Sequence, residues 1–536
     1  MLTYSSRKGA KLVLHGSPVG GDVDELRLKS NNLSGNTFIM VRADWGTVDI
    51  DSTKITSWDE SASGPDTKYA QYGRAYIQVK SRLGSDGVTP RESRMDIKNS
   101  DIGYLGYYGA EAYGLSWKVL GSLSSDKTIF NTVGVYGDIL NNKIHNNYFG
   151  VYTYGAEAMT FRNNEVYQSV KYGIDPHDDS DYLTIDGNYS HNNGSHGIIC
   201  SQRCNNLVIT NNTSSNNGGN GIMLHRNTND SLVEGNTLYN NIDSGIAIFD
   251  SHWNTVRNND AKHNKNGIRL SVGSSNNVVE NNFFSENSKY GMYFYKGSDS
   301  PTSGDGRLRF NTFRNNTVNA NISVAAKIQQ ADSNIFKGNE FTGNSSYAAE
   351  INDSNNNTFK KNILTGNTFN YYYAKTGAVN SIQDSDSFAV KIGGATSSMT
   401  IASSGNFVYQ NSKNIPTIVY PLNSAIVISR SNAASSIVNF DRLDFSVTPA
   451  TESLVITPIV WNTSGDFSQK WTAKSDISNT ITATHIVGDL APGVSYDIFV
   501  DGTFWNSFIA GDSGEIVFDY TDVFQNTPTF EVRATL

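Results

Sequence analysis

The middle of the chain repeats one short pattern, a glycine followed by an apolar residue, in FGVYTY (149–154), YGIDPH (172–177), HGIICS (196–201), NGIMLH (220–225), SGIAIF (244–249), NGIRLS (266–271) and YGMYFY (290–295). These glycines are 22 to 24 residues apart. A second marker keeps the same interval, namely Asn164, Asn188, Asn212, Asn236, Asn259 and Asn282, resumed by Asn316, Asn339 and Asn362. Two sets of residues with one period indicate a repeat architecture.

The length and content of this repeat predict a right-handed parallel β-helix. The segments are short and apolar, lack a helical 3.6-residue period, and would stack about 4.8 Å apart. Leucine-rich repeats have a similar length, but their leucine consensus is absent here. Asparagine suits the corners because it tolerates left-handed backbone and because its amide can pair with the same amide of the next coil. We expect the β-helix to cover residues 1–380.

The pattern changes after about residue 375. Residues 385–536 contain alternating segments such as NSAIVIS (423–429), SLVITPIVW (453–461) and YDIFVDGTFW (496–505), separated by glycine-rich turns. This alternation predicts a β-sandwich, and LAPGVSYDIFVDG (490–502) is similar to a fibronectin-III module. The expected fold is therefore all-β, a β-helix followed by a sandwich for which an accessory, docking or carbohydrate-binding role is expected.

Composition excludes several function classes. A chain of 536 residues with a net charge of −9 lacks the basic face that general nucleic-acid binding needs. No apolar run of 18 residues predicts a membrane span, and the first residues lack a signal-peptide core, so the chain is expected to be cytoplasmic or to have lost an export signal. Cys200 and Cys204 would be about 13 Å apart in an extended strand, too far for a disulfide, and no zinc-binding spacing occurs.

Strand parity predicts which side chains face outward. Residues one and three after each glycine are mostly apolar and should point into the core. Residues two and four should point out, and they are Tyr152/Tyr154, Asp175/His177, Ile199/Ser201, Met223/His225, Ala247/Phe249, Arg269/Ser271 and Tyr293/Tyr295. The segment AYGLSWKV (112–119) places Lys118 at the same outward offset. This face is either a binding groove or an ordinary solvated surface.

The run YGIDPHDD (172–179) is the sharpest local feature. Pro176 cannot donate to a strand ladder, so its place in a central strand breaks a local rule and favours function. Arg203 should lie one coil further and two positions along from His177, within reach of an arginine side chain. A neutral histidine beside arginine and tyrosine suits removal of the C5 proton of a uronate, whose carboxylate an arginine or a protonated aspartate would neutralise. We expect the Asp175 carboxylate to orient the imidazole or to meet the substrate.

Five interpretations of this cluster remain open on residues alone. A uronate epimerase returns a proton to the opposite sugar face, whereas a lyase expels the 4-oxygen from the same carbanion. A glycoside hydrolase would need facing carboxylates, and Asp175, Asp178 and Asp179 are available, although Asp175 alone has groove parity. A non-catalytic adhesin would explain the repeats but not Pro176. The histidine and aspartates could also be exposed residues of a polar turn.

The run YGIDPHDDS resembles the signature of mannuronan C5-epimerases, the β-helix enzymes that modify alginate. The stretches ITSWDE (55–60), SRMDIKNSDIGYLGYYGAEAYGLSWKV (93–119) and HGIICSQRCNN (196–206) are similar to the periplasmic bacterial branch. The resemblance covers roughly residues 10 to 300. The calcium-dependent branch has an arginine one coil further on, where this chain reads NGGNG, and no GGxGxD run occurs.

The resemblance implies polymer-level epimerisation of β-D-mannuronate to α-L-guluronate, with His177 as base, Tyr172 before the motif, Asp175 as its first acid and Arg203 neutralising the substrate carboxylate. The residues expected to bind substrate are Lys118, Tyr154, Asp178, His196, His225, Arg226 and Arg269. No metal site or cofactor is expected, and calcium is allowed but not implied. The expected partner is an anionic polysaccharide, and the protein should be a periplasmic, secreted or cell-surface monomer.

Overall fold

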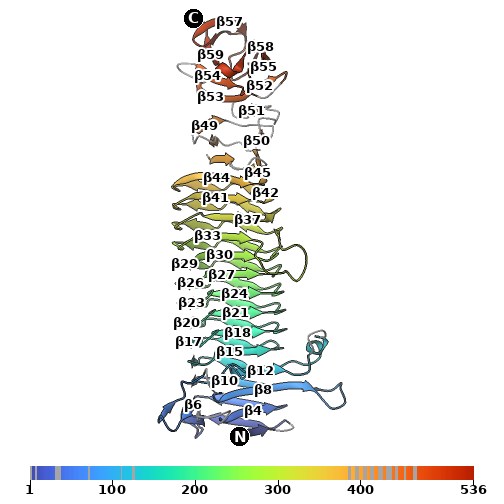
Figure 1. Ribbon diagram of the computed structural model, residues 1–536, viewed down its shortest axis with the longest axis vertical. Helices are drawn as coiled ribbons and strands as arrows, with labels where there is room; N and C mark the ends of the chain where they lie inside the picture. Colours follow the sequence, from blue (N-terminus) through green and yellow to red (C-terminus); the bar gives the residue numbers. More distant parts are fainter. Residues whose placement is uncertain are drawn as a thin grey trace. The chain divides into compact units, whose positions relative to one another are not determined.

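The computed structural model describes residues 3–6, 9–30, 38–69, 73–109, 112–122, 127–383, 388–392, 397–401, 407–410, 416–419, 426–429, 438–440, 445–451, 454–462 and 468–535. The chain forms two compact units, Met1–Asn311 and Thr312–Leu536. Within the first unit, successive coils stack along one axis, each contributing a strand to each of three parallel sheets (Figure 1). This arrangement confirms the predicted parallel β-helix.

The first sheet of this unit carries the glycine segments. Its strands, in ladder order, are β1 (Thr3–Ser6), β4 (Met40–Asp44), β8 (Tyr76–Leu83), β12 (Gly114–Val119), β15 (Phe149–Tyr154), β18 (Ile174–His177), β21 (Ile198–Ser201), β24 (Ile222–His225), β27 (Ser244–Phe249), β30 (Asn266–Ser271) and β33 (Tyr290–Tyr295).

The other two sheets are built from shorter strands. The second contains β2 (Lys11–His15), β5 (Thr47–Asp51), β10 (Arg94–Lys98), β13 (Asp138–Leu140), β16 (Thr160–Arg162), β19 (Thr184–Asp186), β22 (Val208–Thr210), β25 (Leu232–Glu234), β28 (Thr255–Arg257) and β31 (Val278–Glu280). The third contains β3 (Glu25–Lys29), β6 (Lys54–Asp59), β11 (Asp101–Gly103), β14 (Lys143–His145), β17 (Glu165–Tyr167), β20 (Tyr189–His191), β23 (Thr213–Ser215), β26 (Thr237–Tyr239), β29 (Asp260–Lys262) and β32 (Phe283–Ser285). Short additions are β7 (Gly64–Pro65), β9 (Pro90–Arg91), β34 (Leu308–Arg309) and the 3-10 turns η1 (Ser17–Val19) and η2 (Thr128–Asn131).

The predicted parity holds along the core. The residue after each ladder glycine is at most 1% exposed, in the series Val151, Ile174, Ile198, Ile222, Ile246, Ile268 and Met292. The glycines themselves are required by close packing. A Cβ at Gly173 would lie 2.3 Å from Ser190 Oγ and 2.5 Å from the carbonyl oxygen of Gly197.

The asparagine ladder is confirmed, with one correction. Asn188 Nδ2 donates to Asn212 Oδ1 at 2.9 Å, and Asn212 Nδ2 donates to Asn236 Oδ1 at 3.0 Å. These laddered residues are buried and do not have positive φ, contrary to expectation. The left-handed corner residue is the one before each of them, such as Asn211 with φ 55°. A second buried ladder, which we did not predict, joins Asn193, Asn217, Asn241, Asn264 and Asn287.

In the second unit, three-sheet coils continue before an antiparallel domain. The parallel strands are β35 (Thr312–Arg314), β36 (Thr317–Asn319), β37 (Ala326–Gln329), β38 (Ala331–Asp332), β39 (Ile335–Lys337), β40 (Glu340–Thr342), β41 (Tyr347–Asn352), β42 (Asn355–Lys360), β43 (Ile363–Thr365), β44 (Phe369–Thr376), β45 (Val379–Gln383), β46 (Phe388–Ile392), β47 (Ser398–Ile401) and β48 (Phe407–Gln410). Antiparallel β49 (Pro416–Val419) and β50 (Ile426–Ser429) pair with β48 and β47. Strands β46, β47 and β48 still pair in parallel, past residue 380 where we expected the β-helix to end. The boundary between the two domains stays a prediction.

The C-terminal region packs two antiparallel sheets. One contains β51 (Val438–Phe440), β52 (Phe445–Pro449), β55 (Ile481–Val487) and β58 (Ile516–Asp522), and the other β53 (Val455–Asn462), β54 (Ser468–Lys474), β59 (Thr529–Ala534), β56 (Ser495–Val500) and β57 (Thr503–Ile509), with the turn η3 (Phe524–Asn526). The sheets meet through Trp471, whose ring centroid lies 4.8 Å from that of Phe445. The predicted β-sandwich is confirmed. Parts of the predicted 385–536 domain lie outside the described residues.

Candidate active site

The candidate site lies on the first sheet, at β18. Between β18 and β21 the register pairs Ile174 with Ile198 and His177 with Ser201. Pro176 lies between these pairs and has no N–H to donate to β21. Backbone of positive φ begins at Asp178 (33°) and Asp179 (54°), so the strand turns directly after His177. The chain thus presents His177 at the outer end of a short strand.

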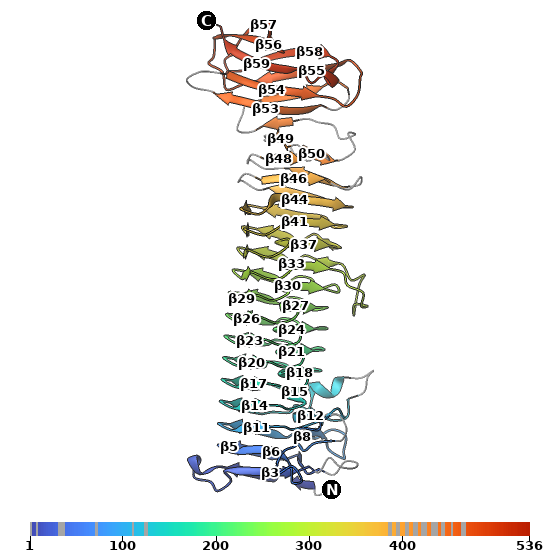
Figure 2. The ribbon, with the colours of Figure 1, turned by 60° about the vertical axis from the view of Figure 1, so that its left-hand side comes forward.

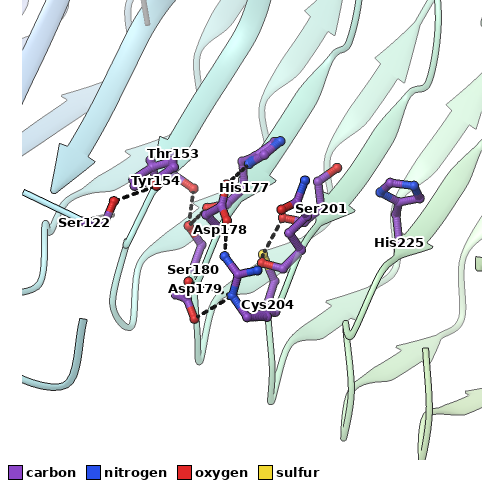
Figure 3. A network of polar contacts seen from close by, with 12 residues as sticks. Ser122, Thr153, Tyr154, His177, Asp178, Asp179, Ser180, Ser201, Cys204 and His225 are labelled. Atoms are coloured by element: carbon purple, nitrogen blue, oxygen red, sulfur yellow. Dashed lines mark hydrogen bonds and ion pairs between the residues drawn. The ribbon is translucent and has the colours of Figure 1, made fainter. Parts of the chain in front are cut away.

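One position of the sheet lines up the predicted site residues from coil to coil. The paired residues are Lys118, Tyr154, His177, Ser201, His225 and Phe249. Figure 3 shows Tyr154, His177, Ser201 and His225 on successive strands. The predicted offset of Lys118 is therefore correct, despite a register shift between Gly114 and Leu115.

His177 is held by a neighbouring carboxylate. Its Nδ1 lies 2.7 Å from Oδ2 of Asp178. The other oxygen of this carboxylate, Oδ1, accepts a hydrogen bond from Arg203 Nη2 (Figure 3). Arg203 Nε also donates to Asp179, at 3.0 and 3.2 Å. We expected Asp175 to orient the imidazole or meet the substrate. The hydrogen bond to the ring comes instead from Asp178, which we had placed among the substrate-binding residues.

These contacts fix the charges of the pair. Burial lowers the pKa of His177, but the hydrogen bond to Asp178 and the charges of Asp175 and Asp178 raise it above its ordinary value overall. Burial raises the pKa of Asp178, yet its bond to His177 and the charges of His177, Arg203 and Lys127 hold it below its ordinary value. Asp178 is therefore an anionic acceptor, which keeps a proton on Nδ1 and leaves Nε2 as the basic nitrogen of the neutral ring.

Asp175 is a buried carboxyl in the groove wall. It is 1% exposed, and among the described residues neither of its oxygens has a hydrogen-bond partner. Burial raises the pKa of Asp175 to about 7, partly offset by His177. The group is therefore largely protonated below neutral pH, and its O–H can donate to an anion that enters the groove.

A groove of about 450 Å3 opens beside these residues. Its lining residues are Tyr113, Phe149, Tyr152, Tyr154, Tyr172, Asp175, His177, Asp178, His196, Ile199, Ser201, Gln202, Met223 and His225. The floor is apolar, because Ile199 and Met223 pack with Ala247, Phe249 and Val272. Aromatic walls, an apolar floor and a few polar groups are typical of a saccharide site.

Two aromatic rings of the preceding strand, β15, lie beside the histidine. The ring centroid of Tyr152 lies 5.8 Å and that of Tyr154 6.5 Å from His177. Tyr172 stacks on His196 at 5.4 Å, and burial raises the pKa of Tyr172, which keeps its phenol protonated at neutral pH. Burial lowers the pKa of both His196 and His225 to about 4, so these rings are neutral.

Sequence reasoning missed one rim of the groove, the loop that contains η2. Lys127 Nζ lies 3.1 Å from Tyr154 Oη and 3.9 Å from Asp178 Oδ1, and Ser122 Oγ lies 2.7 Å from the same phenol. Lys118 Nζ lies 5.0 Å from the Tyr154 ring. No repeat pattern marks this loop. The missed wall residues Tyr113 and Phe149 do carry a signal, since each directly precedes a ladder glycine, as Tyr172 and His196 do.

The three predicted arginines are not among the residues that line the groove. Arg203 lies behind Asp178 and is paired as described. Arg226 lies 3.3 Å from the Ser300 carbonyl oxygen and 3.7 Å from Asp299, and Arg269 lies 3.1 Å from Asp243. Among the described residues, no three His, Cys, Asp or Glu side chains form a group that could hold a metal ion. In the same residues, no helix is long and apolar enough to cross a membrane.

Comparison with known proteins supports the family resemblance. A family model described as a right handed beta helix region matches residues 84–238 and 199–305. The mannuronan C5-epimerase of Pseudomonas aeruginosa is 30% identical over 158 residues, which is 29% of this chain and 27% of that protein. The mannuronan C5-epimerase AlgG of Azotobacter vinelandii is 27% identical over 185 residues, 34% of this chain and 32% of that protein. This chain is similar to the mannuronan C5-epimerases over about a third of its length.

The matched region is a minor part of each curated relative, since it covers about a third of their length or less. A crystal structure of the periplasmic alginate epimerase AlgG aligns with 60% of this chain and 73% of its own, at 21% identity and a TM-score of 0.46. The A-module of the Azotobacter vinelandii mannuronan C-5 epimerase AlgE6 aligns with 68% of this chain at 13% identity and a TM-score of 0.30.

Proposed function

We propose that this chain inverts C5 of β-D-mannuronate within alginate, giving α-L-guluronate without cutting the polymer. The observation that carries the proposal is the His177–Asp178 pair, which faces a groove beside a buried, unpartnered Asp175. In this pair His177 supplies a base, and the neighbouring Asp175 carboxyl, when protonated, supplies a hydrogen-bond donor for an anion. The relatives named mannuronan C5-epimerase indicate the substrate class.

The first step is removal of the C5 proton. His177 Nε2 takes it while Nδ1–H stays on Asp178, which stabilises the imidazolium that forms. The electron pair of the broken C–H bond moves toward the substrate carboxylate, giving an enolate-like dianion. Burial opposes ionisation of Asp178, but the hydrogen bond to His177 and the positive charges of Arg203 and Lys127 keep it ionised for this role.

Neutralisation of the substrate carboxylate is assigned to the Asp175 O–H. Asp175 lines the groove, has unsatisfied oxygens and is protonated below about pH 7. Arg203, which we first expected in this role, already contacts two carboxylates and acts through Asp178 as a positioning residue. A direct contact between Arg203 and substrate stays a prediction that kinetics can test.

The second step returns a proton to C5 from the opposite sugar face. Tyr172, or a water held near it, is the candidate donor because its buried phenol remains protonated at neutral pH. Elimination of the 4-oxygen would instead make the chain a lyase with the same base. We further propose that the protein is exported to the periplasm or cell surface, where such a polymer would be met, and acts as a monomer.

The direct test is a time course of 1H NMR spectra on polymannuronate. We expect guluronate signals to grow with wild-type protein and to be absent with His177→Ala. Growth of unsaturated uronate ends as the main product would assign a lyase. An unchanged polymer would reject both.

A further inference from the structure

A second feature lies on the corner that follows the first sheet, outside the groove. One residue per coil there has left-handed backbone, and those from Tyr182 to Asn276 each donate the N–H to the next coil. In order, these residues are Tyr182 (φ 57°), Asn206 (56°), Asp230 (53°), Trp253 (56°), Asn276 (60°) and Phe310 (58°). Asparagine and aspartate accept this backbone readily, whereas bulky aromatic residues do so at a cost.

Core packing does not explain the aromatic corner residues. Tyr182, Trp253 and Phe310 are 57%, 57% and 60% exposed. A strained backbone position with an exposed aromatic side chain breaks a local rule without an evident gain in stability. Such positions point to function.

A pocket of about 400 Å3 lies between two of these aromatics. Trp253 and Phe310 both line it, with Asn276 of the intervening coil and the side chains of Asn227, His252 and Arg309. The two aromatic residues are two coils apart, about 10 Å at the strand spacing. This leaves room for a sugar unit beside or between the rings.

One wall of this pocket is a loop, residues 296–307, which turns back beside the coils of β30 and β27 (Figure 2). Thr302 anchors the loop through its N–H, which donates to Asp250 at 2.8 Å, and through its hydroxyl at 2.5 Å. Arg226 holds the same loop through the Ser300 carbonyl oxygen. Arg226 thus has a structural task that the sequence did not indicate.

The polar groups of the pocket favour an anionic sugar. His252 Nδ1 accepts the Ser275 N–H at 3.2 Å and burial lowers the pKa of His252, so the neutral ring carries its proton on Nε2 and can donate from there. Arg307 and Arg309 both line the pocket. Arg309 donates through Nη1 and Nη2 to the Asp305 carboxylate, at 2.7 and 2.8 Å. These groups carry more positive than negative charge beside flat aromatic faces, which suits a ring bearing hydroxyls and a carboxylate.

We propose that Trp253 and Phe310 form a second binding site, separate from the catalytic groove, for a segment of an anionic polysaccharide of the uronate class. The site would hold the polymer on the side of the coils while another segment lies in the groove. The choice of a uronate rests on the proposed function. The existence of a saccharide site rests on the corner aromatics and their pocket.

The test measures binding in a catalytically inert background. His177→Ala is combined with Trp253→Asn and Phe310→Asn, and retardation in gels that contain polymannuronate is compared with the His177→Ala parent. Asparagine suits a left-handed corner, so the melting temperature should stay equal or rise. We expect roughly tenfold weaker binding, from the loss of two stacking contacts. The matched control is Phe283→Asn, an aromatic 41% exposed on the third sheet, which should bind as the parent does.

Each outcome decides the proposal. Unchanged binding in the double asparagine variant, or an equal loss with Phe283→Asn, would overturn it. A fall in melting temperature in step with binding would show that the aromatics serve the fold. Equal retardation by a neutral glucan would reject the uronate class. If the active chain fails to epimerise polymannuronate but binding still depends on the two aromatics, the proposed function falls and the site stands.

Discussion

Asp178 bonds to His177 on one side and to Arg203 on the other, with His177 Nδ1 at 2.7 Å from its carboxylate. The imidazole is thereby fixed in one tautomer with Nε2 directed away from the carboxylate. This relationship makes Asp178 the residue on which the state of the base depends.

Asp178→Asn should lower kcat by about 10²- to 10⁴-fold, because the amide no longer stabilises a protonated imidazole. The carboxylate raises the pKa of His177. Its removal should therefore move the acidic limb of the pH profile of kcat/KM to lower pH. The control is Asp179→Asn, because Asp179 accepts from Arg203 Nε rather than contacting His177. An equal effect of both variants would contradict the assigned role.

Arg203→Lys tests positioning against substrate contact. A lysine cannot reproduce a planar fork that serves two carboxylates, so kcat should fall. The positive charge of Arg203 lowers the pKa of His177. Arg203→Ala should therefore shift the acidic limb to higher pH. A rise in KM with no change in kcat or in this limb would instead mean that Arg203 binds the substrate carboxylate.

Asp175→Asn tests the buried acid. In the wild type, kcat/KM should fall above about pH 7 as Asp175 ionises. Asparagine cannot ionise, so the alkaline limb should disappear or move to higher pH. Retention of the wild-type alkaline limb would assign that limb to another group.

The same substitution has an effect on stability with a defined sign. The folded pKa of Asp175 is about 7 against 3.8 for an ordinary aspartate, so ionisation favours the unfolded chain. The free energy of unfolding is therefore highest, as far as Asp175 is concerned, below the unfolded pKa. It falls by a few kcal/mol as the pH rises through 7. Asp175→Asn should therefore raise the free energy of unfolding at pH 8 and change it little at pH 4, as urea titrations can measure.

The β-helix was predictable from the regular spacing of its glycines and asparagines. The structural role of each asparagine was not. Equal spacing identifies a repeat, and parity separates core residues from outward ones. The two asparagines of each NN pair look alike in the sequence, although Asn212 is buried in the ladder and Asn211 is the exposed left-handed corner. The spatial partner of a side chain depends on rotamers. The sequence therefore indicated a cluster around His177, but it could not show that Asp178 bonds to the imidazole or that the oxygens of Asp175 have no hydrogen-bond partner among the described residues.

This asparagine pair gives a prediction on stability. Asn212→Ala removes an amide that donates to the Ile185 carbonyl oxygen at 2.8 Å and to Asn236, and leaves buried partners unsatisfied. We expect a loss of about 3 kcal/mol. Asn211→Gly should be nearly neutral, since glycine accepts positive φ. Chemical denaturation of both variants checks this, and equal losses would contradict the distinction between ladder and corner.

In the proposed reaction, His177 abstracts the C5 proton and a second donor, with Tyr172 or a nearby water as the candidate, returns one to the opposite face. The most direct measurement is the reaction with polymannuronate in heavy water, followed by NMR and by chain-length analysis. We expect guluronate units with deuterium at C5 and an unchanged chain length. Guluronate that retains hydrogen at C5, or shortened chains with unsaturated ends, would contradict this mechanism.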